Sequence, residues 1–383
     1  MTTIAAISAL KSCSTIADVE KLAKLRLAVN VKDFVCGGAE GQWTLERNVR
    51  QFEKFLIRKR IPDKIRTEVC LKTELQIKNT KLEYDLPIGM SPISLHGLVH
   101  AKAEEPMITA SNTLNVPAIA SSLSNLPFDK IATVSKENNA WIQMYIPANE
   151  KHMFRSIELI HKLDYKALVV SIGCPISGRR RNDERNQFSL PAHLRYGNFP
   201  HVRSSPHKHP APLLHSEHIS QYVSQTFQWE NLKDIIQKSD MPVIAKGILR
   251  GDDAERAIEA GCHGIFVSNH GGRQLDHVPA TIECLREIVK LVNKRVPILM
   301  DCGVRSGADI LKALGLGADF VFIGRPYLYG LSLSGKAGII HVFDILKQEL
   351  VDELTAAGYS DIQSVKDDVI NNFVVHESYY NDI

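Results

Sequence analysis

Short apolar runs alternate with helical patterns from about residue 86 to about residue 324. This alternation is typical of repeated βα units that build a parallel sheet. The runs lie at 86–93, 116–122, 141–146, 167–172, 241–248, 264–269, 296–301 and 320–324. Because each run is nearly continuous in apolar residues and is followed by small or polar ones, the pattern favours eight buried strands in a closed barrel.

The segments between the runs have apolar residues at helical spacing, as at Ala308, Leu311 and Leu314 after the seventh run. Such faces are expected to pack outside a barrel. The predicted fold class is therefore α/β, a (β/α)8 TIM barrel with a helical N-terminal extension. The predicted divisions are 1–80 for the extension, 81–360 for the barrel, with a long loop at 179–225, and 361–383 for a C-terminal tail. A loop of that length, rich in Pro, His, Ser and Arg, is typical of a lid or a disordered segment.

The composition changes this picture little. With 383 residues, of which 44% are hydrophobic and 23% charged, the chain matches a globular protein with one large core. Its 46 basic and 43 acidic residues are interspersed, so no nucleic-acid partner is implied. The 7 cysteines form no Cys-x-x-Cys pair, which fits a reducing intracellular compartment. We expect no signal peptide and no membrane span.

Chemistry-bearing residues gather where the apolar runs end, and in a (β/α)8 barrel that edge holds the active site. These ends carry Gln143 and Tyr145 (third run), Lys246 (fifth), Ser268 through Arg273 (sixth), Asp301 through Arg305 (seventh), and Gly324 with Arg325 (eighth). No Gly-x-Gly-x-x-Gly follows the first run, which disfavours a Rossmann nicotinamide site.

The seventh and eighth ends suit a phosphate group. Gly303 allows close backbone approach, and Arg305 and Arg325 offer charged donors. Phosphate binding after strands seven and eight is common in these barrels. The alternative is that these glycines only form tight turns, but two glycine-arginine turns on adjacent strands favour phosphate.

His270 is the candidate general base, because it follows a strand end and has glycine neighbours that leave it accessible. A lone histidine is more often structural. Here, however, Tyr145, Arg180 and Lys246 are expected at the same barrel mouth, and Arg273 can bind a carboxylate with two donors. The histidines at 207, 209, 215 and 218 lie in the long loop without a rigid scaffold, so no metal is predicted.

The nine residues from Ser268 to Asp276 resemble the signature of the FMN-dependent 2-hydroxy-acid oxidase and dehydrogenase family, which includes glycolate oxidase. The similarity runs from Gly38 to Gly338. It implies an FMN cofactor and oxidation of an (S)-2-hydroxy acid to a 2-oxo acid, with oxygen as the acceptor and hydrogen peroxide as the product. It also implies a homo-oligomer, a tetramer, and often a peroxisomal location. The final Asn-Asp-Ile is not a Ser-Lys-Leu address, which leaves a cytoplasmic location open.

The resemblance also implies roles for individual residues. His270 would take a proton from the substrate, Arg180 and Arg273 would hold its carboxylate, and Tyr145 would lie near its oxygen. Lys246 would lie beside the flavin N1 and C2 carbonyl. Further flavin contacts are expected from Ser91, Pro92, Ile93, Ser121, Gln143, Ser171 and Ser268, and ribityl or phosphate contacts from Asp301, Gly303, Arg305, Gly324 and Arg325.

The chain departs from the family pattern at several positions. Phe34 replaces a tyrosine that touches the carboxylate, and Gly173 replaces an aspartate that orients the histidine. Asp183 or Glu184 could supply the missing carboxylate. Leu123 stands where glycolate-preferring members have tryptophan, which predicts a larger substrate than glycolate.

Three functions are consistent with these residues. The first is an FMN oxidase of 2-hydroxy acids. The second is a flavin-binding homologue with weak or no oxidase activity, because Phe34 and Gly173 replace the family residues. The third is another phosphate-binding barrel such as an isomerase, against which the motif around His270 argues.

Overall fold

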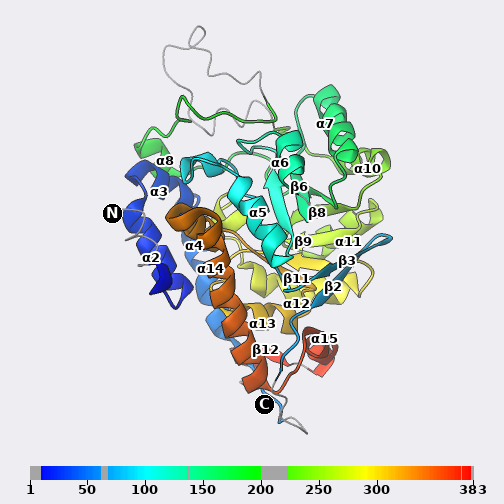
Figure 1. The fold of residues 1–383 in the computed structure, drawn as a ribbon. Coiled ribbons are helices and arrows are strands. Elements are labelled where there is room, and N and C mark those ends of the chain that lie inside the picture. Colours follow the sequence, from blue (N-terminus) through cyan, green and yellow to red (C-terminus); the bar gives the residue numbers. More distant parts are fainter. Residues whose placement is uncertain (1–9, 62–67, 136–138, 200–222, 372, 381–383) are drawn as a thin grey trace.

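In the computed structural model, which describes residues 10–61, 68–135, 139–199, 223–371 and 373–380, eight parallel strands close into a barrel (Figure 1). The strands are β4 (Ile88–Met90), β5 (Ala118–Ser121), β6 (Ala140–Tyr145), β7 (Leu168–Ser171), β8 (Val243–Ile248), β9 (Gly264–Val267), β10 (Ile298–Met300) and β11 (Phe320–Ile323). Their order is β10-β11-β4-β5-β6-β7-β8-β9. Each observed strand lies within or next to a predicted run, so the predicted barrel is confirmed.

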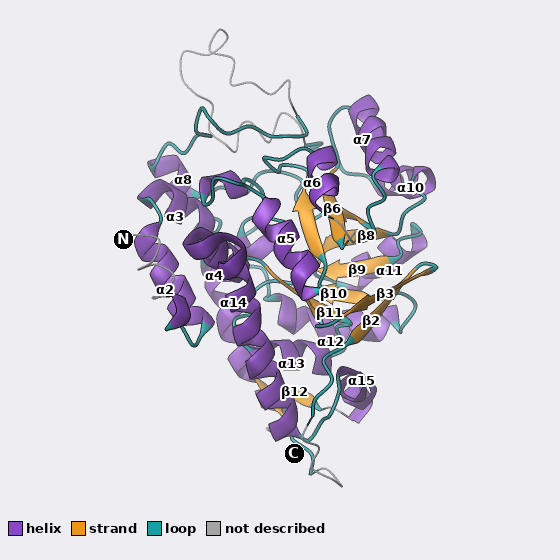
Figure 2. Cartoon of the chain, in the orientation of Figure 1, coloured by secondary structure: helices purple, strands orange, loops and turns teal. Residues whose placement is uncertain are grey.

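Helices surround the barrel, as Figure 2 shows. They are α5 (Glu105–Leu114), α6 (Phe128–Val134), α7 (Glu150–Lys162), α10 (Trp229–Lys238), α11 (Gly251–Glu259), α12 (Thr281–Val292), α13 (Gly307–Gly315) and α14 (Arg325–Ala357). The α14 helix is interrupted at Ser334 and Gly335, and Gly358 ends it in the left-handed conformation at φ 85°. Gly335 has φ 58°, and a Cβ there would lie 2.9 Å from the Nε2 atom of His100, so a side chain would be strained.

The described part of the N-terminal extension contains α2 (Ile16–Arg26), α3 (Val29–Cys36) and α4 (Trp43–Arg50), followed by the 3-10 turn η1 (Gln51–Lys54). Thr15 and Asp18 form a capping box at the start of α2, which satisfies backbone N–H groups there. The α2 helix packs against α14 through its buried Ile16, Val19 and Ala23. The extension thus joins the hydrophobic core of the barrel.

The extension is not helical throughout, and the prediction for 1–80 is wrong in its last part. Strand β1 (Phe55–Ile57) follows η1, and β2 (Thr73–Ile77) and β3 (Thr80–Tyr84) form an antiparallel hairpin. Buried and exposed residues alternate along β2, which is the period of a strand with one covered face. The covered side chains pack against inward-facing residues near the strand starts, and Trp141 donates to the Tyr84 hydroxyl at 3.2 Å. The hairpin therefore closes the end of the barrel opposite the predicted site.

The predicted C-terminal tail is also ordered where it is described. It contains α15 (Ile362–Asp367), the turns η4 (Asp368–Asn371) and η5 (Glu377–Tyr380), and β12 (Val374–His376), which pairs with β1. Because Phe373, Val374 and Val375 are buried, this segment is part of the core. In the long loop, α8 (Arg181–Arg185) is described. Residues 200–222, with the four loop histidines, lie outside the described residues.

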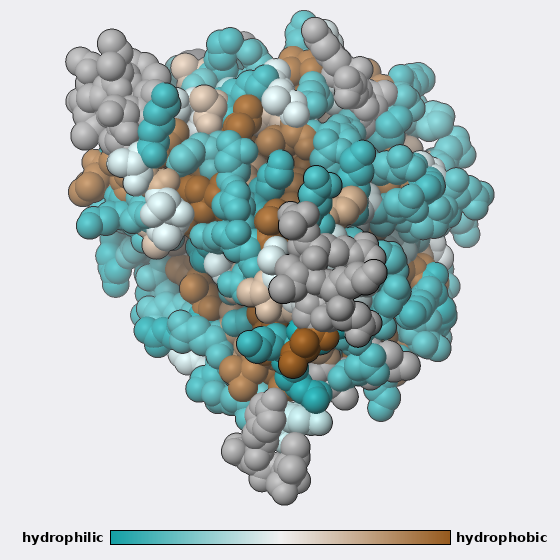
Figure 3. Space-filling model, turned by 60° about the horizontal axis from the view of Figure 1, so that its bottom comes forward, coloured by the Kyte–Doolittle hydropathy of each residue, from teal (hydrophilic) through white to brown (hydrophobic). Residues whose placement is uncertain are grey.

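Hydrophilic side chains cover much of the face seen in Figure 3, with apolar residues between them. Within the described ranges, no helix has the length and apolar character needed to cross a membrane. The same ranges contain no group of three or more His, Cys, Asp or Glu residues that could hold a metal ion.

Candidate active site

A cavity with about 960 Å³ of open space lies at the carboxyl ends of the strands. The predicted residues that line it are Ser91, Pro92, Ile93, Ser121, Tyr145, Lys246, His270, Arg273, Asp301, Gly303, Arg305, Gly324 and Arg325. We call this the cofactor cavity.

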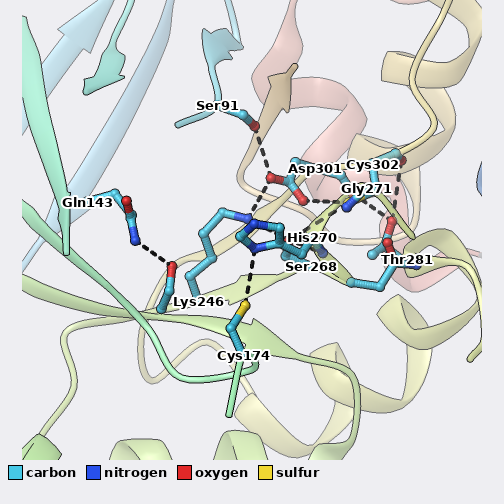
Figure 4. Close-up of polar contacts among 12 residues, drawn as sticks. Ser91, Gln143, Cys174, Lys246, Ser268, His270, Gly271, Thr281, Asp301 and Cys302 are labelled. Atoms are coloured by element: carbon cyan, nitrogen blue, oxygen red, sulfur yellow. Dashed lines mark hydrogen bonds and ion pairs between the residues drawn. The ribbon is translucent and has the colours of Figure 1, made fainter. Parts of the chain in front are cut away.

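A buried ion pair lies at the floor of the cofactor cavity (Figure 4). The Nζ atom of Lys246 is 2.7 Å from Oδ2 of Asp301 and also donates to the Ser268 hydroxyl at 2.5 Å. The Ser91 hydroxyl donates to the same carboxylate at 2.9 Å. Burial raises the pKa of Asp301, but the Lys246 charge and hydrogen bonds outweigh it, so that its pKa is lowered. Asp301 is therefore a carboxylate at neutral pH.

Three residues that were predicted to contact the flavin, Gln143, Ser171 and Ser268, do not line the cavity but lie behind its lining residues. The Ser121 hydroxyl donates to Oε1 of Gln143 at 3.0 Å, and Nε2 of Gln143 donates to the Ser171 hydroxyl at 3.0 Å. Ser268 is likewise buried, beneath Lys246. Gln143, Ser171 and Ser268 are thus not among the residues that line the cavity; they orient side chains that do.

The charge of the lining favours an anionic ligand. Among the described residues, four cations line the cavity and one carboxylate does: Lys246, Arg273, Arg305 and Arg325 against Asp301. Gly324, at the start of α14, lines the cavity, and a Cβ there would be in ordinary van der Waals contact with Ile93 at 3.7 Å. Cations and an accessible backbone beside the beginning of a helix fit the phosphate of the expected FMN.

Arg325 also fixes the N-terminal extension over the cavity. Its guanidinium donates to three backbone carbonyls, those of Val35 at 3.0 Å, Gly37 at 2.8 Å and Gly271 at 3.1 Å. Arg305 lies 3.6 Å from Glu20 in α2. The extension that sequence patterning placed outside the barrel therefore contributes to the site.

His270 lies at the beginning of the turn η3 (His270–Gly272), in the left-handed conformation at φ 58°. Its Nε2 atom is 3.3 Å from the Tyr145 hydroxyl, and its Nδ1 atom is 3.3 Å from the Cys174 Sγ atom. Burial and the nearby charge of Lys246 lower the pKa of His270 to about 3. The imidazole is therefore neutral at physiological pH and has a lone pair available for a proton.

A second cavity, of about 560 Å³, adjoins the first and shares Phe34, Ser94, Tyr145, His270 and Arg273 with it. We call this the substrate cavity. Arg180, the remaining predicted site residue, lines it. Both cavities are thus in contact with the candidate base.

The two arginines of the substrate cavity each use part of their donors within the protein. The Nε atom of Arg180 donates to Asp183 at 2.7 Å, and Nη1 of Arg273 donates to the carbonyls of Phe34 at 2.7 Å and Gly37 at 3.0 Å. The Phe34 ring lies 5.0 Å from the Arg273 guanidinium carbon and 5.8 Å from that of Arg180. Phe34 thus supports the arginines through its ring but offers no hydroxyl.

The suggestion that Asp183 or Glu184 replaces the missing carboxylate partner of His270 is wrong. Asp183 pairs with Arg180, and Glu184 pairs with Arg179 at 2.9 Å. Both carboxylates are held by arginines in the turn that follows β7. The side chain that reaches Nδ1 of His270 is Cys174, one residue beyond Gly173. Sequence reasoning missed it because it looked only for a carboxylate.

Asp276, the last residue of the signature, anchors the extension. Its carboxylate accepts hydrogen bonds from the backbone N–H groups of Gly41 (3.1 Å), Trp43 (3.3 Å) and Thr44 (2.8 Å) at the start of α4. We expect Asp276→Ala to lower the free energy of unfolding by about 1–3 kcal/mol, because the buried N–H of Thr44 and the partly buried N–H groups of Gly41 and Trp43 lose their acceptor. Urea denaturation would measure this. Exposed Asp252→Ala is the control, and an equal loss there would contradict the anchoring role.

The chain resembles known proteins over most of its length. Residues 23–372 match the family described as FMN-dependent dehydrogenase. The chain is 33% identical over 353 residues to human 2-hydroxyacid oxidase 1, covering 91% of this chain and 94% of that protein. It is 33% identical over 363 residues to the L-lactate oxidase of Nostoc sp., covering 94% and 98%. A mandelate oxidase structure with (S)-4-hydroxymandelic acid superposes with a TM-score of 0.86 at 32% identity, covering 92% and 98%.

Proposed function

Because the chain belongs to the family of FMN-dependent dehydrogenases, we propose that it oxidises a 2-hydroxy acid with an apolar side chain to the 2-oxo acid, with oxygen as the acceptor. The observation that carries the proposal is the position of His270, a neutral base that lines both the cationic cofactor cavity and the substrate cavity with two arginines. The relatives described above are named as oxidases of hydroxy acids. This does not favour the alternative that the chain is a flavin-binding homologue with weak or no oxidase activity.

The chain's own residues account for binding and proton transfer. Arg180 and Arg273 bind the substrate carboxylate through guanidinium N–H groups other than those that donate to Asp183, Phe34 and Gly37. This places the hydroxyl beside Nε2 of His270, which takes its proton, with the Tyr145 hydroxyl as a donor to the substrate oxygen. Bound FMN supplies the two-electron acceptor. Lys246, a buried residue of the cofactor cavity, would supply a positive charge to the bound flavin at a site that burial shields from water.

The substrate side chain is expected to meet an apolar wall. Phe34, Leu123, Ile176 and Val223 line the substrate cavity, and none of them has a polar side-chain atom. Burial of each additional methylene is worth about 0.8 kcal/mol. We therefore expect kcat/KM to rise several-fold per methylene from glycolate to a medium-chain 2-hydroxy acid.

The test is anaerobic. The protein is loaded with FMN and mixed with a panel of (S)- and (R)-2-hydroxy acids, and bleaching of the flavin absorbance is followed. Bleaching by an apolar (S)-acid, followed by peroxide formation when oxygen is admitted, is the expected result. Bound flavin that no acid of the panel bleaches would overturn the proposal. Glycolate turnover equal to that of a medium-chain acid would overturn only the substrate preference.

The family resemblance further leads us to propose a homotetramer and a peroxisomal or cytoplasmic location. Light scattering of the purified protein tests the first, since a tetramer of a 42.8 kDa chain has a mass about four times as large. Imaging of the tagged protein in its own cell tests the second.

A further inference from the structure

The ring nitrogen of His270 that faces away from Tyr145 has a sulfur partner. Cys174 Sγ lies 3.3 Å from Nδ1, and the cysteine is only 8% exposed. Figure 4 shows the thiol pointing directly at the imidazole. We propose that Cys174 is a positioning residue whose sulfur accepts a hydrogen bond from the Nδ1–H group of His270. The lone pair of Nε2 can then act as the base. This inference rests on the proposed function, because it assigns how that base is held.

The surroundings of the sulfur favour this direction of the hydrogen bond. Oε1 of Gln274 accepts from the Gly178 N–H at 2.9 Å, which leaves the amide NH2 group of Gln274 as the donor on the side of Cys174, and this side chain acts to lower the pKa of the thiol against the larger effect of burial. The sulfur of a neutral thiol has lone pairs that can accept a hydrogen bond from Nδ1–H. On the other side of the ring, burial raises the pKa of Tyr145 well above its usual range, so its hydroxyl stays protonated and can donate to Nε2. An imidazole with its proton on Nδ1 satisfies both neighbours.

A thiol differs from a carboxylate in charge. Burial raises the pKa of Cys174 to about 12, so the sulfur is neutral at physiological pH. The charged groups that act on His270 are Lys246, Arg273 and Arg180, which disfavour the imidazolium, and Asp301, which favours it. Burial and the cations prevail, and the pKa of the ring is lowered to about 3. His270 would be protonated, and unable to act as a base, only below this pH. The rate of flavin reduction should therefore not fall on the acidic side of its pH profile between pH 5 and 8.

Position 174, rather than 173, is where a carboxylate could be restored. A Cβ on Gly173 would lie 2.9 Å from both the Cα and the carbonyl oxygen of Gly247, so a side chain there requires a backbone shift. Cys174, in contrast, already directs its side chain to the ring. Lys246 and Arg180 both lower the pKa of its thiol, and the same cations would keep an aspartate ionised.

The first experiment reads the tautomer without any turnover. Long-range ¹H–¹⁵N spectra of histidine-labelled protein, with FMN bound, are recorded from pH 5 to 8, and the His270 signals are assigned by their loss in His270→Gln. We expect the Nδ1-protonated tautomer and no titration in this range. The Nε2-protonated tautomer, or titration near pH 6.5, would overturn the proposal whether or not the protein oxidises any acid.

The second experiment uses three substitutions and anaerobic flavin reduction. Cys174→Ser keeps an acceptor and should stay within a few-fold of wild type, whereas Cys174→Ala should be slower by about 10–100-fold. Cys174→Asp should bring an acidic limb into pH 5–8, since a carboxylate raises the pKa of the imidazole. Cys70→Ser, at an exposed thiol far from the site, is the control and should match wild type.

Cys174→Ala with the rate and pH profile of wild type would refute the positioning role while leaving the proposed oxidase intact. Failure of the wild type to reduce its bound flavin would instead refute the oxidase. In that case the tautomer spectrum, together with its change in Cys174→Ala, still decides the contact between Cys174 and His270.

Discussion

Replacing His270 with glutamine is expected to slow anaerobic flavin reduction by about 10²–10⁴-fold, the usual contribution of a positioned general base. Glutamine is of similar size and can still donate to a neighbour, but it cannot take the substrate proton. The loss should appear in the rate at saturating acid, because Arg180 and Arg273 still bind the carboxylate. Stopped-flow absorbance of the FMN-loaded variant measures it.

The matched control is His277→Gln. This histidine lies seven residues further along the same chain segment, with a side chain that is 74% exposed, and its ring contacts Trp43 outside both cavities. It should keep the wild-type rate. His270→Gln with bound flavin and a rate within three-fold of wild type would rule out His270 as the base, and Tyr145 would then be the next residue to vary.

The barrel and most of the cofactor cavity could be predicted from the sequence because local rules determine them. Buried parallel strands are continuously apolar, and their carboxyl ends meet at one mouth, so the positions of Lys246, Asp301 and Arg325 along the chain suffice to bring them together. The hairpin β2–β3 was missed because the period of a short strand is easily hidden in a segment assigned to helices. The hairpin closes one end of the barrel through tertiary contacts with residues such as Trp141, which a local sequence pattern does not reveal.

The partner of His270 could not be predicted for a different reason. A pattern search asks for the residue type that usually performs a role, and at position 173 it finds a glycine. The thiol of Cys174 reaches the ring only because the chain turns after β7 toward η3, which places residues 96 positions apart within 3.3 Å. The anchoring of Phe34 and Gly37 by Arg273 is equally non-local. Side-chain direction at a turn is a property of the folded chain.

Replacing Lys246 with methionine is expected to lower the free energy of unfolding of the flavin-free protein by about 3–5 kcal/mol, the usual cost of leaving a buried charge without its partner. The side chains of Lys246 and Asp301 are only 5% and 8% exposed, so water cannot compensate for the lost ammonium. The Ser91 hydroxyl would remain as a donor to the carboxylate but carries no charge. Urea denaturation at pH 7 measures the difference, and a loss below about 1 kcal/mol would show that the pair is not buried in solution.

A double substitution separates the charge from the packing. In Lys246→Met combined with Asp301→Asn neither position of the pair carries a charge, so the double variant should be more stable than Lys246→Met alone. Its flavin reduction should stay slow, because the positive charge at the cofactor cavity is still missing. A double variant as unstable as the single one would mean that the contact of the Lys246 ammonium with the Phe266 ring, 4.5 Å from Nζ to the ring centroid, matters more than its pairing with Asp301.

The free energy of unfolding should depend on pH differently in the wild type and in Lys246→Met. In the wild type the pKa of Asp301 is lowered, so the stability that the ion pair contributes is present at neutral pH and is lost as the pH falls through that lowered value. In Lys246→Met, burial without the ammonium raises the pKa of the same carboxyl, so its protonation on acidification relieves the unpaired charge. The gap between the two unfolding free energies should therefore narrow from pH 7 to pH 4. A gap that stays constant over this interval would contradict the assignment of the destabilisation to Asp301.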